Sequence, residues 1–530
     1  MTIGVLLVAA VILLSILAEN FSGKIGMPAL ILFMFIGMIF GSDGVLKIPF
    51  NDYTRADQIC SIALLFIMFY GGFNTKWKLA KSVAAKSILL STVGTAITAG
   101  ITGMFCHFCL GFSPIEGFLV GAVLSCTDAA SVFSILRNKK LNLKDGTASL
   151  LEIESGSNDP TAYLLTIIGI GLLNGGHQQP IPLTIILQVT FGILTGIAFA
   201  AITIWILTKT QWISEGLATI FMIAMVLLCY GLTEMVGGNY FLSTYIMGIL
   251  IGNSDIENKN ILIHFFDGLT SLSQILIFFL LGLLTFPHEI VPIIPISIAI
   301  TVFLTLIARP IAVFALLLPM KCSKNQCLLT SWAGLRGASS SVFAIMVVAN
   351  TATSSHDLFH IVFMVSLFSA AIQGTLLDKV AKKLNMVDDT LDVRKTFNDY
   401  QEEAAITLMR MYIPKGHSWE NKAIKDVHMP TGSLALMIKR NGQNIITKGD
   451  TVILAEDNII LSIPAYNPGG NEKLEEIQID ANHDWVNKKI VDLNLPSDEL
   501  IAMIIRGSEN IIPDGKTMIY ANDIVVTYHE

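Results

Sequence analysis

The sequence has 530 residues, of which 53% are hydrophobic and 14% charged, whereas about a quarter of the residues in an ordinary soluble domain are charged. The net charge is −7, and all of it comes from residues 381–530, which hold 16 Lys and Arg against 23 Asp and Glu. This composition excludes a soluble globular protein and a protein that binds nucleic acid through a basic surface.

Apolar runs long enough to cross a bilayer fill residues 1–380. We predict thirteen transmembrane helices, at 3–18, 26–42, 57–73, 87–111, 115–136, 148–174, 181–208, 214–236, 239–252, 264–285, 291–319, 326–350 and 358–377. With the N-terminus outside, the inner loops carry 14 Lys and Arg and the outer loops carry two, which is the bias that cytoplasmic loops show. The sequence therefore predicts an all-α polytopic domain in the cell membrane, with its N-terminus outside and the C-terminal tail in the cytoplasm.

The fifth span contains an ionisable residue, Asp128, among small and hydroxylated residues. Ionisable groups are costly inside a bilayer and mark functional positions there. Small and hydroxylated neighbours suit a broken helix, whose free carbonyls can coordinate a cation. The alternative is that Asp128 only caps a half-helix or pairs with one Lys.

The sixth span begins with three acidic residues and a proline, in the stretch Glu152–Pro160. We expect Asp159 to be buried there, because burial raises the pKa of a carboxyl group and so allows both its protonated and its ionised form near neutral pH. Such a group can hold either a proton or a dehydrated cation. Asn158 is adjacent, and Ser155 lies one turn earlier on the helix face of Asp159. The pattern predicts a proton-coupled cation site.

The twelfth span contains Arg336, which needs a buried acid, and we expect Glu154 to be that partner. Residues 129–135 and 339–345 are similar in sequence. They occupy equivalent places if spans one to six and eight to thirteen are repeats of opposite topology. The sequence therefore predicts inverted repeats with two broken crossing helices, as in many secondary transporters.

The tail contains a duplication. Residues 381–402 are predicted to form a polar helical linker, and residues 417–462 then align without a gap with residues 483–528, with nineteen identities in forty-six positions. Each copy is predicted to hold a short helix followed by β-rich stretches that end at turns. We therefore expect two α+β lobes, at 403–465 and 473–530, that form a pseudo-symmetric pair.

Four motifs in order resemble the signatures of NhaP-type monovalent cation:proton antiporters, and most closely those of the potassium/proton antiporter subgroup. They are Thr127–Phe133, Glu152–Pro160, Phe265–Leu269 and Trp332–Gly337. The resemblance covers residues 1–380.

The resemblance implies a role for each residue of the predicted site. Asp159 takes the place of the proton and cation site, and the pair that it forms with Asn158 marks electroneutral exchange. Thr127 and Asp128 match the unwound crossing segment. Ser155 and Asn158 match positions that support the site.

The resemblance also implies that Glu154 and Arg336 form a structural ion pair. One position departs from the family pattern. Tyr70 stands before Gly71-Gly72, where relatives often have an acid. The contribution of the third span to ion coordination, and hence the ion preference, is not predicted by the resemblance.

Each tail copy is similar to the RCK C-terminal (TrkA-C) domain, which regulates potassium transporters, in some cases by binding cyclic di-AMP between two lobes. Arg440, Arg506, His417 and His483 stand at equivalent positions and are candidate phosphate-binding groups for such a ligand. The alternative is that they only maintain the lobe fold. No GxGxxG motif follows a predicted strand, so we expect the nucleotide-binding half of a complete RCK module to be absent.

Together these features predict a secondary active antiporter that exchanges cytoplasmic K⁺ (or Na⁺) for external H⁺ and is regulated by its tail. The alternatives are a Na⁺/H⁺ antiporter with a purely structural tail and a ligand-gated cation channel, although no pore filter of the Thr-Val-Gly-Tyr-Gly kind is present. We expect no enzymatic activity, no metal and no resident cofactor, because the ten histidines are scattered and Cys106 and Cys109 lack a second pair at ligand spacing. We also expect a homodimer and no nucleic-acid partner.

Overall fold

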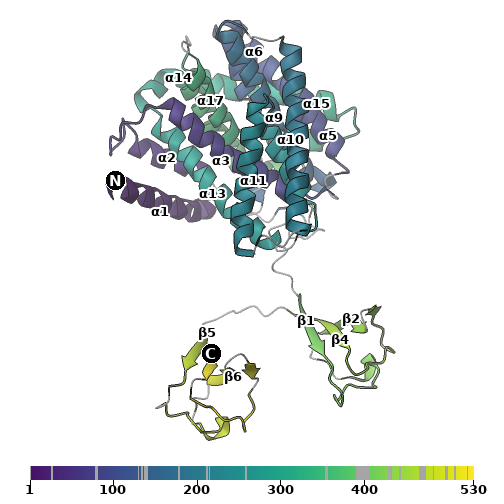
Figure 1. Ribbon diagram of the computed structural model, residues 1–530. Helices are drawn as coiled ribbons and strands as arrows, with labels where there is room; N and C mark the ends of the chain where they lie inside the picture. The colour runs from purple at the N-terminus through teal and green to yellow at the C-terminus, as the bar shows by residue number, and fades with distance from the viewer. Residues whose placement is uncertain are drawn as a thin grey trace. The chain divides into compact units, whose positions relative to one another are not determined.

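The structure is a computed structural model in which the chain divides into two compact units, Met1–Asp399 and Tyr400–Glu530. The first unit is helical, and the second contains the strands (Figure 1). The structure describes residues 2–25, 28–77, 81–128, 131–132, 135–136, 141–176, 180–209, 213, 215–256, 259–351, 356–388, 406–427, 429, 433–440, 443–464, 473–480, 483–493, 495, 499–506, 509–511, 513–521 and 523–529. Most of the predicted linker, residues 389–402, lies outside these ranges, as do residues 403–405 of the predicted first lobe.

The helices of the first unit follow one another in three groups. The first group is α1 (Thr2–Ile25), α2 (Ala29–Phe40), α3 (Tyr53–Asn74), α5 (Ala84–Leu89), η1 (Leu90–Gly94), α6 (Thr95–Leu110) and α7 (Pro114–Val123). The second is η2 (Lys144–Gly146), α9 (Thr147–Leu173), α10 (Ile181–Lys209), α11 (Glu215–Met235), α12 (Tyr240–Gly252) and α13 (Lys259–Leu283). The third is α14 (Pro287–Phe303), η3 (Leu304–Ala308), α15 (Arg309–Leu317), α16 (Lys324–Trp332), α17 (Ala338–Asn350), α18 (Leu358–Phe368), η4 (Ser369–Gly374) and α19 (Thr375–Lys383).

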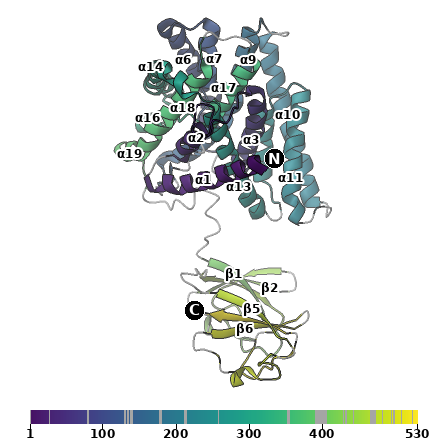
Figure 2. The same ribbon diagram turned by 90° about the vertical axis from the view of Figure 1, so that its left-hand side faces the viewer.

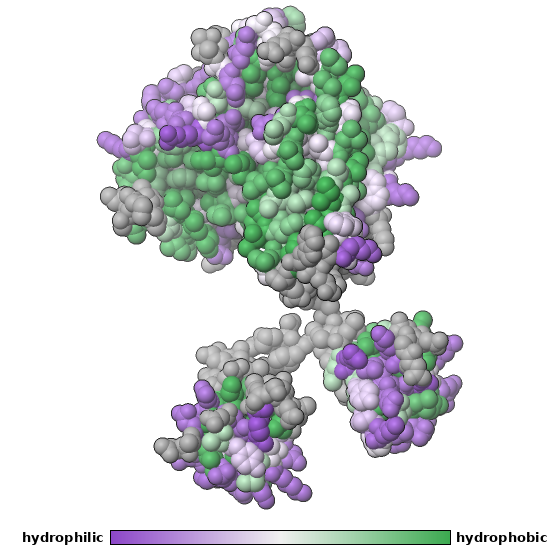
Figure 3. Space-filling view, in the orientation of Figure 1, coloured by the Kyte–Doolittle hydropathy of each residue, from purple (hydrophilic) through white to green (hydrophobic). Residues whose placement is uncertain are grey.

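The outside of this unit is apolar. Within the described residues, seven helices are long and apolar enough to cross a membrane, and shorter apolar helices accompany them. Large side chains such as Leu194 and Ile197 are exposed on α10, while the small residues Gly192, Gly196 and Ala200 form its buried side. Figure 3 shows a broad hydrophobic surface over α10 and α11. An apolar exterior of this kind suits lipid, and the predicted number of thirteen spans stays a prediction.

Two helices are interrupted inside the unit, and their broken segments meet. The first interruption follows α7, where Leu124–Asp128 is not helical, and Ser131 is the next described residue in helical backbone. The second separates α16 from α17. The backbone N–H of Asp128 donates to the carbonyl oxygen of Leu335 at 2.8 Å, which joins the two segments. The two broken crossing helices expected from the sequence are therefore present.

The order of elements repeats around these interruptions. A helix containing a π-helical turn, α5–η1–α6, precedes the first interrupted helix, and α14–η3–α15 precedes the second. A long helix follows each, namely α9 and α18–η4–α19. This recurrence fits the two repeats expected from the sequence.

The second unit contains two sheets of the same topology. One has the strand order β1 (Ile406–Tyr412), β4 (Asn458–Pro464), β2 (Leu434–Arg440), β3 (Gln443–Ile446), and the other has β5 (Lys473–Gln478), β8 (Ile524–His529), β6 (Glu499–Arg506), β7 (Glu509–Ile511). Figure 2 labels two strands of each sheet. All pairs are antiparallel, and both sheets have an irregularity at the same place in their central strand, Ala435/Met437 and Ile501/Met503.

The lobes contain less helix than predicted. Within the described residues, the helical structure of each lobe is one 3-10 turn, η7 (Ile424–Asp426) or η8 (Ile490–Asp492), where the sequence led us to expect a short α-helix. The pairing of the two lobes stays a prediction.

Candidate ion-binding site

Asp159 lies in the middle of α9, opposite the beginning of α17. Its side chain is buried, with 3% of the residue exposed. One carboxylate oxygen, Oδ2, accepts a hydrogen bond from Ser339 Oγ at 2.5 Å. The other, Oδ1, is buried and has no hydrogen-bond partner. A buried acceptor without a partner is rare in folded proteins, and it calls for an ion, a water or a proton as part of the function of the site.

Three further predicted residues meet on the side of Asp159 that faces the first interruption. Thr127 Oγ1 lies 2.8 Å from Ser155 Oγ and accepts a hydrogen bond of 2.7 Å from the side-chain amide of Asn158. The backbone N–H of Thr127 donates to Asn158 Oδ1 at 3.3 Å. The structure thus brings Thr127, Ser155, Asn158 and Asp159 together, where α9 crosses the end of α7.

The predicted ion pair between Glu154 and Arg336 is wrong. Glu154 is fully buried, and its Oε2 pairs with Nη2 of Arg309 at 2.8 Å, while its Oε1 accepts from Asn158 Nδ2 at 3.0 Å. Arg309 is itself 1% exposed and lies at the junction of η3 and α15. The sequence did mark Arg309 as a candidate partner, because it is the single ionisable residue between positions 291 and 319.

Arg336 instead binds the end of a helix. Its Nη1 donates to the carbonyl oxygens of Ser125 and Cys126, at 2.9 and 2.5 Å. Its backbone N–H donates to Ser369 Oγ at 3.0 Å. The free carbonyls after α7 carry the negative end of the helix dipole, so they accept a cation without a carboxylate. This explains how the charge is accommodated in the absence of Glu154.

Asp128 caps the helical segment that follows the first interruption. Its carboxylate accepts from Ser131 N–H at 3.3 Å and from Ser131 Oγ at 2.6 Å. Gly337 of the second interruption packs against it, since a Cβ there would lie 2.0 Å from Asp128 Oδ2. This is the capping geometry of the alternative stated for Asp128, and its role as an ion ligand stays a prediction.

Aromatic side chains pack against α9 one turn after Asp159. Tyr163, one turn after Asp159, is 4% exposed and packs against Tyr240, Phe241 and Phe343, with ring centroids 4.8, 5.1 and 6.1 Å away. These rings join α9 to α12 and α17 on the C-terminal side of Asp159.

Tyr70, the position that departs from the family pattern, has a partner that the sequence analysis missed. Its hydroxyl donates to Asp267 Oδ1 at 3.0 Å, which links α3 to α13. Asp267 belongs to the motif Phe265–Leu269, so the motif was recognised but not the contact.

The candidate ligand residues of the tail are engaged within their own lobes. Arg440 forms a bidentate pair with the buried Asp457 at 2.8 and 2.7 Å, and Arg506 forms the same pair with Asp523 at 2.8 and 2.8 Å. The ring nitrogens of the two histidines accept from the backbone two residues later, His417 from Trp419 and His483 from Trp485. These contacts favour the interpretation that the four residues maintain the lobe fold.

Comparison with known proteins agrees with this division of the chain. The family model described as "Sodium/hydrogen exchanger, transmembrane" matches residues 8–383, and the TrkA-C domain matches residues 408–465 and 474–526. The chain is 32% identical over 468 residues to a K(+)/H(+) antiporter NhaP of Alkalimonas amylolytica, covering 86% of this chain and 80% of that protein. It is 31% identical over 462 residues to a K(+)/H(+) antiporter NhaP2 of Shewanella baltica, covering 86% and 79%.

Among solved structures, the chain is similar to the sodium proton antiporter MjNhaP1 from Methanocaldococcus jannaschii at pH 8. The TM-score is 0.65 and the sequence identity 22%, over 72% of this chain and 99% of that one. At this identity the similarity shows the fold.

Proposed function

Because the chain belongs to the transmembrane sodium/hydrogen exchanger family and carries two TrkA-C domains, we propose that it is an electroneutral antiporter that exchanges cytoplasmic K⁺ for external H⁺. The family is one of transporters, and the chain is a multi-pass membrane protein. The potassium preference is supported by the relatives named K(+)/H(+) antiporters, which align with 86% of this chain.

The observation that carries this proposal is the state of Asp159. It is a buried carboxylate with one oxygen bound to Ser339 and the other without a partner. Within the described residues, no Lys or Arg forms an ion pair with it, whereas the neighbouring Glu154 is neutralised by Arg309. An ionised Asp159 therefore needs a cation from solution, and a neutral Asp159 needs a proton.

This arrangement supports exchange of one cation for one proton. Glu154 is committed to Arg309, and the adjacent Asn158 is an uncharged amide bound to Thr127 and Glu154. One carboxylate is then available for either ligand, so a proton and a monovalent cation displace each other at equal charge. Hydroxyl oxygens are suitable ligands for a hard cation, and those of Thr127, Ser155 and Ser339 are the proposed ligands beside Asp159.

The orientation proposed from the loop charges places the N-terminus outside and the tail in the cytoplasm. The homodimer stays a proposal as well. Cyclic di-AMP remains the proposed ligand of the tail, but the Arg440–Asp457 and Arg506–Asp523 pairs favour the second candidate, a tail that is structural in these positions.

The test is exchange in everted membrane vesicles that hold a pH-sensitive dye. Adding K⁺, Na⁺ or Li⁺ separately should dissipate a preformed proton gradient for the wild type, with the strongest response to K⁺. Asp159→Asn should insert normally and give no response to any of the three ions. Cation-driven proton movement by Asp159→Asn would contradict the proposal.

A further inference from the structure

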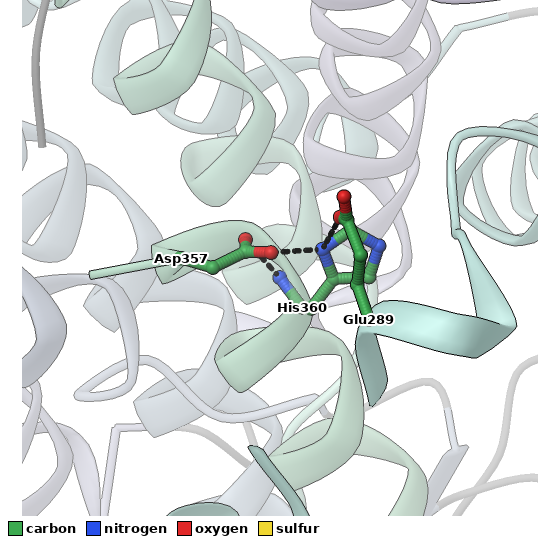
Figure 4. A group of neighbouring side chains, drawn as sticks. All are labelled: Glu289, Asp357 and His360. Carbon is green, nitrogen blue, oxygen red and sulfur yellow. Dashed lines mark hydrogen bonds and ion pairs between the residues drawn. The ribbon is translucent and has the colours of Figure 1, made fainter. Parts of the chain in front are cut away.

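A second group of titratable side chains lies where α14 and α18 begin (Figure 4). His360 is buried, with 2% of its side chain exposed, and its Nδ1 lies 2.5 Å from Asp357 Oδ2 and 3.7 Å from Glu289 Oε2. The two carboxylates thus share one edge of the ring. On the opposite edge, the backbone N–H of Phe286 donates to His360 Nε2 at 2.9 Å. We call Phe286, Glu289, Asp357 and His360 the clasp.

The Phe286 hydrogen bond determines the state of the ring. An Nε2 atom that accepts carries no proton, so the neutral ring has its proton on Nδ1 and donates it to Asp357. If the neutral ring binds one more proton, that proton must go to Nε2. The clasp in this structure is therefore its deprotonated form, and protonation of His360 would set two N–H donors against each other.

The same geometry argues against a metal ion, although the three ligand-type atoms lie within 4.8 Å of one another. Two ligands of one ion at about 2.1 Å from it are separated by about 3 Å or more. His360 Nδ1 and Asp357 Oδ2, at 2.5 Å, are closer than that and share a proton. A metal would displace this proton and break the bond from Phe286 as well.

The surroundings favour the uptake of a proton. Within the described residues, neither Asp357 nor Glu289 forms an ion pair with Lys or Arg. Burial opposes ionisation of Asp357, but hydrogen bonds from His360 and from the backbone outweigh it and lower the pKa of this carboxyl group. Asp357 is therefore the charged partner of the ring.

Other titratable groups face the clasp from the neighbouring elements. On α14, His288 lies 3.8 Å from Glu289 and also pairs with Asp43, which follows α2. On α3, Tyr53 packs edge-to-face against Phe359, at 5.5 Å between ring centroids.

One further pair lies before α18, where His356 is 3.5 Å from Glu116 of α7. Among the described neighbours named here, none brings a permanent positive charge to the clasp.

The two helices that the clasp joins both lead to the ion site. α14 continues through the π-helical turn η3 to Arg309, the partner of Glu154. α18 continues into the π-helical turn η4, whose first residue, Ser369, accepts from the backbone of Arg336. π-helical turns interrupt the regular hydrogen bonding of a helix and are frequent at functional sites. The clasp is thus connected through two continuous helices to both arginines of the site.

We propose that the clasp is a regulatory proton site, at which protonation of His360 breaks the bond from Phe286, releases α14 from α18 and slows exchange. This inference rests on the proposed function, whose orientation places the clasp outside. Its consequence is protective. When the outside becomes acidic the driving force for proton entry grows, and the clasp then reduces the rate at which protons enter.

The test is the rate of ⁸⁶Rb⁺ efflux from right-side-out vesicles at a fixed internal pH, with the external pH lowered from about 8 to about 5, the range in which histidine changes its charge. The wild-type rate should first rise, as external protons become available, and then fall. His360→Gln presents a carbonyl oxygen to Phe286 and takes up no proton, so its rate should not fall. At the acidic end it should exceed the wild-type rate by about fivefold, the equilibrium factor of one net hydrogen bond.

Two further variants separate the clasp from its neighbourhood. Asp357→Asn keeps the helix cap but removes the charge that stabilises protonated His360, so the fall should move to lower pH. His288→Gln changes an exposed histidine on the same helix turn and should leave the fall in place.

The proposal would be overturned if the efflux rate fell in the same way at acidic external pH in the wild type and in His360→Gln. A wild-type efflux rate that never falls would overturn it as well. Inhibition by micromolar external Zn²⁺ at neutral pH that disappears in His360→Gln would also overturn it, by making the clasp a metal site. A wild type without any cation-driven flux would instead contradict the proposed function itself.

Discussion

The helical unit and the tail lobes both use pairs of arginine and carboxylate, but in different surroundings. In the helical unit Glu154 and Arg309 are 0% and 1% exposed. In the lobes the carboxylates of Asp457 and Asp523 are equally buried, but the side chains of Arg440 and Arg506 are 28% and 36% exposed. If Arg309 is removed, Glu154 therefore stays charged in an apolar interior. If the aspartate of a lobe pair is removed, the arginine that remains can reach water.

This difference separates acids that are part of the scaffold from the one available to a transported ion. Glu154, Asp457 and Asp523 each have an arginine, whereas Asp159 has a serine hydroxyl on one oxygen and nothing on the other. A carboxylate that is paired with an arginine loses this ion pair when it binds a proton, which costs free energy. A carboxylate without a permanent positive partner can bind either a cation or a proton without losing an ion pair.

The largest effect is expected from breaking the membrane pair. Arg309→Ala should leave Glu154 buried and charged, at a cost of about 3–5 kcal/mol, and should reduce the amount of folded protein recovered from membranes. Glu154→Gln with Arg309→Gln, which removes both charges, should recover part of the loss. Thermal unfolding in detergent measures both, and a fully stable Arg309→Ala would contradict the pairing.

The contact between the two interrupted helices gives the next effect. Gly337→Ala places a Cβ 2.0 Å from Asp128 Oδ2, so the two segments must separate and transport should fall by at least about tenfold while the protein still inserts. Gly100→Ala is the matched control, because a Cβ there meets nothing within 4 Å. Equal transport by the two variants would show that the close contact is not needed.

The lobe pairs should give a smaller and pH-dependent effect. A hydrogen bond from Arg506 lowers the pKa of Asp523, so this pair contributes stability at neutral pH that is lost as the pH falls through the lowered pKa, on the acid side of the ordinary aspartate range. Asp523→Asn should lower the stability at neutral pH by about 1–3 kcal/mol and flatten this acid dependence.

Fluorescence of Trp485 during denaturation of residues 400–530, with Trp419 replaced by Phe, reports the change in the second lobe. Asp457→Asn is the equivalent variant of the first lobe, with Trp419 as its reporter and Trp485 replaced by Phe. An unchanged acid profile in Asp523→Asn would assign the acid sensitivity of the lobe to another group.

The smallest effect is expected at Tyr70. Tyr70→Phe removes one hydrogen bond to Asp267, so a loss of about 1 kcal/mol and a change of a few fold in the KM for K⁺ are expected, with kcat retained. A change in kcat without a change in KM would place Tyr70 in the transport step rather than in ion entry.

The sequence predicted much of the site because its signals are local. Thr127, Ser155, Asn158 and Asp159 lie in two short motifs, and an ionisable residue in an apolar span is conspicuous by itself. The repeat of the tail was equally visible, since residues at an offset of 66 positions can be compared directly.

The partner of Glu154 could not be found in this way. Arg309 and Arg336 are both single positive charges in distant spans, and spacing along the chain does not say which one reaches α9. The choice is made by the interrupted helices, whose free carbonyls occupy Arg336 and leave Arg309 for Glu154. The clasp was missed for the same reason, since Phe286 and His360 are 74 residues apart and meet only through the packing of α14 on α18.

The most direct test of the account is the number of protons released when a cation binds. Purified protein in a weakly buffered solution with a pH indicator should release one proton for each K⁺ bound, at a pH where Asp159 starts protonated. Asp159→Asn should release none. Release of the same number of protons by Asp159→Asn would show that another group exchanges the proton for the cation and would contradict the central role of Asp159.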